Sequence, residues 1–79
     1  MFIKKTKDGR NNICGISISK IRKELKLSQH ELAVKMQIAG IDIDKNAIQR
    51  IEAGKRFVTD IEIVVFAKIL NIDLKELLL

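Results

Sequence analysis

The stretch SQHELAVKMQIAGIDIDKNAIQRIE, residues 28–52, constrains the fold most strongly because it reads as two short helices joined by a sharp reversal. Ser28 and Glu31 have the spacing of a capping box, in which each side chain accepts from the other residue's backbone amide. An apolar stripe at helical period follows, formed by Leu32, Ala33 and Met36. Gly40 permits the positive φ that a reversal needs, and Asp44 is a favourable N-cap for the second helix.

The second of these helices would have two chemically different faces. Its apolar side chains fall on one face, formed by Ala47, Ile48 and Ile51. The opposite face carries two cations and two amides, with no carboxylate among them: Lys45, Asn46, Gln49 and Arg50. These residue types match base-edge donors and acceptors in a DNA major groove, whereas solvated surface helices more often mix glutamate with lysine. From the residues alone, base reading and a plain solvated face both remain open.

The order SQ-x-x-LA, followed by a polar helix ending IQRIEAGKR, resembles the lambda-repressor-like (Xre, Cro-CI type) helix-turn-helix family of DNA-binding domains. The residues that carry the resemblance are Ser28, Gln29, Leu32, Ala33, Ile48, Ile51, Glu52, Gly54 and Lys55. The likeness extends from about Cys14 to Leu78. The chain departs from the family pattern twice: the stretch between Met36 and Asp44 is longer than the usual tight turn, and Lys26 replaces a customary glycine.

The resemblance implies a compact, all-α, five-helix domain that binds double-stranded DNA as a sequence-specific transcriptional regulator, with repression as the expected role. The residues expected to contact bases are Lys45, Asn46, Gln49 and Arg50, of which Gln49 could instead contact a phosphate. The expected phosphate contacts are Gln29, Lys55 and Arg56. Arg22 and Glu52 are expected to form a structural ion pair between the first and third helices. A homodimer on a palindromic operator is the expected assembly.

Composition is consistent with one small helical domain. The 79 residues are 47% hydrophobic and contain no proline, tryptophan or tyrosine, which is enough apolar material for one core. We expect an arm over residues 1–12 and a helix-turn-helix domain over residues 13–79. The longest near-apolar run, residues 61–70, is too short to span a membrane, and no signal peptide is evident. The single cysteine, Cys14, fits a reducing cytoplasm and is interpreted as a small buried hydrophobe.

The arm, MFIKKTKDGRNN, is basic and rich in turn formers. It could contact phosphates or be a frayed terminus, and we favour the frayed terminus. Met1, Phe2 and Ile3 could dock as a short apolar segment. The net charge of +5 is concentrated here and in the first helix, a distribution that suits a polyanionic partner or serves solubility alone.

The remaining helices follow from apolar spacing and caps. The first is predicted over residues 13–25, starting at Asn12 or Ser17, with a core stripe of Cys14, Ile18, Ile21 and Leu25. Thr59 with Glu62 predicts a capping box for the fourth helix, whose core face would be Ile63, Phe66, Ala67 and Leu70. Its other side is also apolar: Ile61, Val64, Val65 and Ile69. Residues 1–3 or a second subunit would have to cover that side. Asp73 with Glu76 opens a short last helix.

Other function classes find less support in the sequence. An enzyme is not expected, because no carboxylate pair, metal-ligand cluster or nucleophile–base arrangement is recognisable and the single His30 lies in an ordinary exposed position. We expect no metal, no cofactor, no small-molecule ligand and no membrane association. The alternative to DNA binding is a protein-interaction module of the same fold, or the antitoxin component of a toxin–antitoxin pair.

Overall fold

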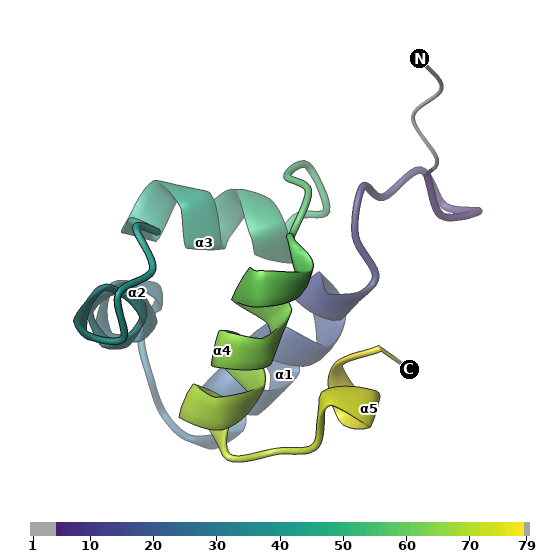
Figure 1. Cartoon of the computed structure of the whole chain (residues 1–79). Coiled ribbons are helices and arrows are strands. Elements are labelled where there is room, and N and C mark those ends of the chain that lie inside the picture. The colour runs from purple at the N-terminus through teal and green to yellow at the C-terminus, as the bar shows by residue number, and fades with distance from the viewer. Residues whose placement is uncertain (1–4, 79) are drawn as a thin grey trace.

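The computed structural model describes residues 5–78, which form five α-helices and no strand (Figure 1). The helices are α1 (Cys14–Glu24), α2 (Gln29–Ile38), α3 (Lys45–Glu52), α4 (Asp60–Leu70) and α5 (Leu74–Leu77). Predictions that concern residues 1–4 and Leu79, including the docking of Met1, Phe2 and Ile3, lie outside the described part. The expected all-α, five-helix architecture is confirmed.

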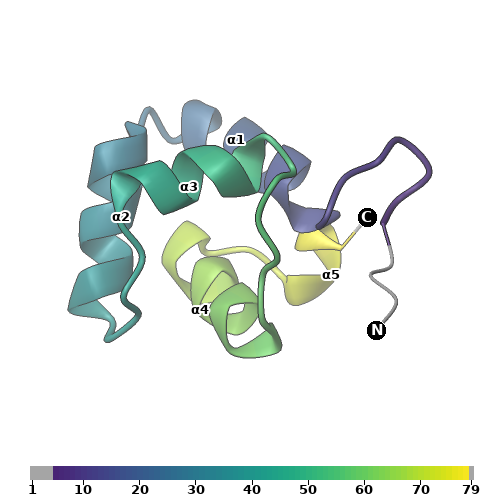
Figure 2. The same cartoon turned by 90° about the horizontal axis from the view of Figure 1, so that it is seen from above.

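One apolar core holds the helices together. α3 packs on α1 and α2, while α4 packs on α1, α2 and α5 (Figures 1 and 2). The largest fully buried side chains come from every helix and from the α2–α3 connection: Phe66, Ile18, Leu32, Met36, Ile43, Ile48, Ile51, Leu70 and Leu77. Cys14 is buried among them, and burial raises the pKa of its thiol. It is therefore a core residue, as the sequence predicted.

Helix starts follow the predicted capping chemistry. Ser28 Oγ accepts from the Glu31 amide at 3.0 Å, and Glu31 Oε1 accepts from the Ser28 amide at 2.8 Å. A second capping box joins Thr59 and Glu62, at 3.2 and 3.0 Å. These side chains satisfy amides that have no partner inside the helix. The N-cap residue of α1 is Ile13, which makes no side-chain cap bond. Asn12, one residue earlier, accepts from the Gly15 amide through Oδ1 at 2.8 Å, so the start of α1 lies next to Asn12 and not at Ser17.

The four longer helices end alike, in Schellman motifs. In each, one residue adopts a positive φ, and the amide of the residue that follows it donates to the carbonyl five residues earlier, in the last turn of the helix. The positive-φ residues are Lys26 (58°), Gly40 (90°), Gly54 (78°) and Asn71 (55°). Lys26, which replaces the customary glycine of the family pattern, therefore occupies a left-handed position that favours glycine.

Three expectations need correction. The segment from Thr6 to Asn12 is not a frayed terminus, because it hydrogen-bonds to the end of α3 and to the following loop. Leu25 was placed on the core stripe but is 50% exposed, since α1 ends at Glu24 and the chain turns there. On α4 the outer apolar side is only partly uncovered: Val65 and Ile69 pack against the core, whereas Ile61 and Val64 remain exposed.

Candidate nucleic-acid interface

The outward face of α3 is polar and free of carboxylates. Ala47, Ile48 and Ile51 are buried against the core. The opposite side chains are all exposed: Lys45, Asn46, Gln49 and Arg50. Within residues 5–78, no hydrogen bond or ion pair engages these four side chains. The structure therefore presents the four predicted base-contacting residues together on one helix face, with their polar groups available.

The long connection between α2 and α3 is packed rather than loose. Ile43 is fully buried and Ile41 packs against the core. Gln37 Nε2 donates to the Ile43 carbonyl at 3.1 Å, and Asp44 Oδ1 accepts from the Ala47 amide at 2.7 Å. The extra residues thus contribute core contacts and fix the direction in which α3 begins.

An ion pair anchors the other end of α3 to α1. Arg22 Nε donates to Glu52 Oε2 at 2.7 Å, and its Nη2 donates to Oε1 at 3.0 Å. Both side chains are about 90% shielded from solvent. Burial raises the pKa of Glu52, but hydrogen bonds from Arg22 and Gln29 and the Arg22 charge outweigh it, so the pKa lies below its ordinary value. The carboxylate is therefore held in its ionised form.

Gln29 belongs to the same network. Its Nε2 donates to Glu52 Oε1 at 3.0 Å, and the residue is the first in α2. The sequence placed this side chain on a DNA phosphate, whereas in the structure it bonds Glu52. The helix N-terminus around it still presents backbone N–H groups of the kind that bind phosphate, so the phosphate role of this position stays a prediction.

The two cations after α3 differ in their surroundings. Lys55 is exposed. Arg56 pairs with Glu62 through two contacts of 3.1 Å, and Arg56 Nη1 also donates to the Phe57 carbonyl at 3.0 Å. Burial raises the pKa of Glu62, but the hydrogen bonds of this carboxylate to Arg56 and Thr59 outweigh burial, so the pKa of Glu62 lies below its ordinary value. Because Glu62 already balances the Arg56 charge, Lys55 is the freer of the two predicted phosphate contacts.

Sequence reasoning missed three residues that hold the end of α3 from the N-terminal side. Arg10 Nη2 donates to the Glu52 carbonyl at 2.8 Å. Asn12 Nδ2 donates to the carbonyls of Ile51 and Arg56, at 3.1 and 2.7 Å. Asn11 bonds the same loop through its backbone and its side chain. Their partners are backbone carbonyls about 40 residues away, and such contacts leave no local pattern in a sequence.

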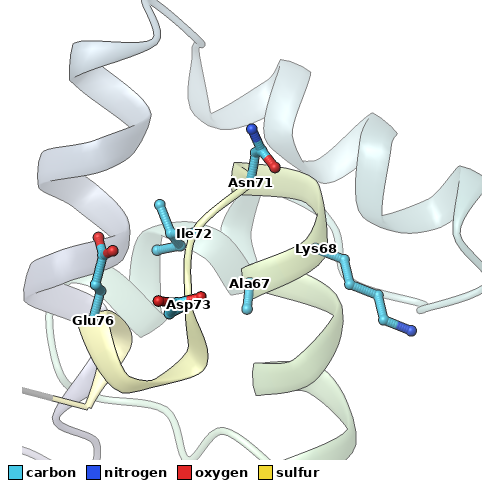
Figure 3. Close-up of a pocket in the computed structure, with 6 residues that line it drawn as sticks. All are labelled: Ala67, Lys68, Asn71, Ile72, Asp73 and Glu76. Atoms are coloured by element: carbon cyan, nitrogen blue, oxygen red, sulfur yellow. The ribbon is translucent and has the colours of Figure 1, made fainter.

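Two surface depressions lie away from the exposed face of α3. The first, of about 310 Å³, is lined by Ala67, Lys68, Asn71, Ile72, Asp73 and Glu76 between α4 and α5 (Figure 3). The second, of about 350 Å³, is lined by Lys35, Ile38, Ala39 and Ile69. In Figure 3 Lys68 points away from the two carboxylates. Across residues 5–78, every helix is too short or too polar to cross a bilayer.

Comparisons with known proteins agree with this geometry. A model of the helix-turn-helix family matches residues 18–77. The restriction-modification controller protein C.AhdI from Aeromonas hydrophila has a similar solved structure, with a TM-score of 0.69 and 30% sequence identity. The match covers 81% of this chain and 86% of that one. A comparison with curated proteins found no match. From the extent of the family match and from the shared fold, the chain belongs to the lambda-repressor-like helix-turn-helix family.

Proposed function

We propose that the protein is a sequence-specific double-stranded DNA-binding transcriptional regulator that reads the major groove with α3. The observation that carries the proposal is the exposed, carboxylate-free face of α3 on a helix fixed at both ends. A fixed helix can present its side chains to base edges in one register, which sequence reading requires. Family membership and the likeness to a controller protein support the same function.

The side chains of α3 are assigned by their place along the helix. Lys45 and Asn46, at its N-terminus, reach base edges first, because recognition helices contact bases mainly through their N-terminal residues. Arg50 follows one turn later, and Gln49 contacts a base or a phosphate between them. Arginine to guanine and asparagine to adenine are the pairings that geometry favours, each worth roughly 1–3 kcal/mol of discrimination.

Phosphate contacts position this helix and supply affinity. Lys55 is exposed in the loop that follows α3, and we assign it to the backbone. The N-terminus of α2 at Gln29 offers amide groups to a second phosphate. Arg56 contributes through its position beside Lys55, with its charge shared with Glu62. Such contacts are insensitive to sequence and weaken with salt.

The assembly we propose is a homodimer on a palindromic operator, with repression as the regulatory outcome. Exposed apolar side chains on α4, Ile61 at 66% and Val64 at 41%, support a contact between two copies through this helix. A two-fold axis would place two α3 helices about 34 Å apart, one turn of the duplex.

Light scattering, which measures the molar mass in solution, tests whether this surface of α4 forms the dimer contact. Ile61→Asp should convert a dimer to a monomer, because it places a charge in an apolar contact. Ile38→Asp is the matched control, since Ile38 is 82% exposed but lies on α2. A dimer that survives Ile61→Asp, or one lost only with Ile38→Asp, would move the interface away from α4.

Selection of bound duplexes from a random oligonucleotide pool tests the proposed function itself. We expect an enriched inverted repeat whose half-sites lie about 10 base pairs apart, centre to centre. Placing the selected site over a promoter and measuring transcription then distinguishes repression from activation. A pool that yields no common sequence, with equal binding to every duplex, would contradict sequence-specific reading.

A protein-interaction module, as in an antitoxin, is the second candidate. Exposed apolar side chains on α4 and around α5, namely Ile61, Val64, Leu74 and Leu78, favour it because they suit a protein partner as well as a second copy. A mobility shift with duplex DNA at low and moderate salt separates the two functions. Absence of any duplex complex at low salt would favour the interaction module.

A further inference from the structure

We propose that residues 5–12 form a second DNA-contacting element, in which Lys5 and Lys7 bind backbone phosphates next to the segment read by α3. The inference rests on the proposed function and adds a contact that the helix-turn-helix itself does not supply. Four features of the structure carry it: the turn within the arm, its attachment to α3, its position and its charge.

The arm is folded into a closed turn. The Thr6 amide donates to the Arg10 carbonyl at 2.9 Å, and the Gly9 amide donates to the Thr6 carbonyl at 2.9 Å. Thr6 Oγ1 accepts from the Arg10 amide at 2.9 Å and donates to Asp8 Oδ1 at 2.6 Å. Gly9 supplies the positive φ that the turn needs. These bonds fix the backbone at Lys7, and Lys5 comes directly before the closed turn.

The turn is attached to the end of α3 and to the loop that carries Lys55. The Asn11 amide donates to the Gly54 carbonyl at 2.7 Å, and Asn11 Nδ2 donates to the Lys55 carbonyl at 3.1 Å. Arg10 bonds the Glu52 carbonyl, as a cation should at a helix C-terminus. Asn12, which is 9% exposed, closes the attachment through the Arg56 carbonyl. The arm is therefore joined by hydrogen bonds to the end of the recognition helix and to the loop that follows it.

The arm lies on the same side of the molecule as α3. Figure 1 shows the arm at the level of α3, beyond the C-terminal end of that helix, with the core on the other side of α3. The view from above in Figure 2 again shows the arm beyond the C-terminal end of α3. A duplex lying against α3 would therefore pass the arm without any rearrangement of the fold.

The charge of this surface suits phosphate. Lys5 and Lys7 are exposed, and Lys55 lies in the loop to which Asn11 is bonded. Asp8 is the one acid in residues 5–12, and its carboxylate is tied to the Thr6 hydroxyl. Lysine is a compact charge on a flexible stem and binds phosphate without reading sequence. The arm should therefore strengthen binding to all duplexes.

The salt dependence of binding by Lys5→Ala/Lys7→Ala tests the inference. Each lost phosphate contact makes the log–log salt slope shallower by about 0.9, so the slope should fall by about 1.8 per protomer. Between about 50 and 200 mM salt this corresponds to a loss of affinity smaller than that of the wild type by roughly 12-fold per protomer, or roughly 150-fold for the proposed dimer. The matched control is Lys23→Ala/Lys68→Ala, with the same charge change in the last turns of α1 and α4, at the end of the molecule away from α3 (Figure 1).

A hydroxyl-radical footprint separates a local contact from a general charge effect. The wild type should protect one cluster of nucleotides per half-site that the arm variant leaves open and the control variant still protects. An arm variant with the wild-type slope and footprint, or one whose losses equal those of the control, would overturn the inference while leaving the proposed function intact. Absence of duplex binding by the wild type would overturn both.

Asn11→Ala supplies an independent check that keeps every charge. It removes the side-chain bond to the Lys55 carbonyl and leaves the backbone bond of Asn11 and the bonds of Arg10 and Asn12 in place, so the same nucleotides should be less protected than in the wild type although Lys5 and Lys7 remain. Thermal unfolding of this variant shows whether the fold is retained. Full protection by a folded Asn11→Ala protein would show that the Asn11 side-chain bond does not position the lysines, and would overturn that part of the inference.

Discussion

Glu52 is the residue at the end of α3 that joins this helix to α1, to α2 and to the N-terminal arm. It accepts from Arg22 of α1 and from Gln29 of α2, and Arg10 bonds its carbonyl. Replacing it by alanine leaves the Arg22 charge buried without its partner, a change that typically costs about 3–5 kcal/mol. Because Glu52 faces the protein and not the outward side of α3, the loss should appear in stability and leave base preference unchanged.

The pH dependence of stability tests the ionised state of Glu52. Its pKa in the folded protein lies below the ordinary value of 4.5. The stabilisation is therefore complete above about pH 4.5 and is lost as the pH falls through the lower, folded-state pKa. Glu52→Gln should be less stable than the wild type at neutral pH by about 1.5–3 kcal/mol, with the difference shrinking in acid. Exposed Glu24→Gln is the control. A difference that persists unchanged down to pH 2 would contradict this assignment.

Lys26 carries a cost that another residue would remove. Its backbone φ of 58° is one that residues other than glycine adopt only with strain. Lys26→Gly should raise the free energy of unfolding by about 1 kcal/mol, which for a domain of this size raises the Tm by about 4–8 °C. Lys23→Gly, inside α1, should lower stability by about the same amount. Equal effects of the two substitutions in a thermal scan would contradict the backbone argument.

At the scale of elements, the direction of α3 is set by contacts at both ends and by a close approach to α1. Gly15 lies so near the Ile51 carbonyl that a Cβ there would overlap the oxygen. Helix starts could be predicted because caps are local patterns, as at Ser28, Asp44 and Thr59. The close crossing of α1 and α3 could not be predicted. In the sequence Gly15 is only a residue with low helix propensity, and nothing in the neighbouring residues indicates that another helix packs against it.

Gly15→Ala separates helix propensity from packing. Propensity alone predicts stabilisation by about 1 kcal/mol, since alanine favours helix over glycine. The overlap with the Ile51 carbonyl predicts the opposite sign, a loss of about 1–3 kcal/mol from overpacking. Denaturant unfolding measures the difference, with Ile16→Ala as an exposed control on the same helix. A stabilised Gly15→Ala protein would show that α1 and α3 are not in close contact at this point.

For the whole molecule, the sequence predicted the helices, the core and the exposed polar face of α3, because helical periodicity and capping depend on residues that are close together in the chain. It did not predict that residues 6–12 are folded, since Arg10, Asn11 and Asn12 bond backbone carbonyls distant in the chain. The same limit explains the surroundings of Gln29 and Arg56. The partner of Gln29, Glu52, lies on another helix, and the partner of Arg56, Glu62, is reached through the loop between α3 and α4.

The specificity ratio, affinity for the selected duplex divided by affinity for a random one, tests the central claim most directly. Arg50→Ala should lower this ratio by roughly 5- to 150-fold, because it removes a base contact worth about 1–3 kcal/mol. Lys55→Ala should weaken binding to both duplexes alike and leave the ratio unchanged. If Arg50→Ala also weakens both duplexes equally, α3 does not read base edges through Arg50, and the proposed mechanism is wrong.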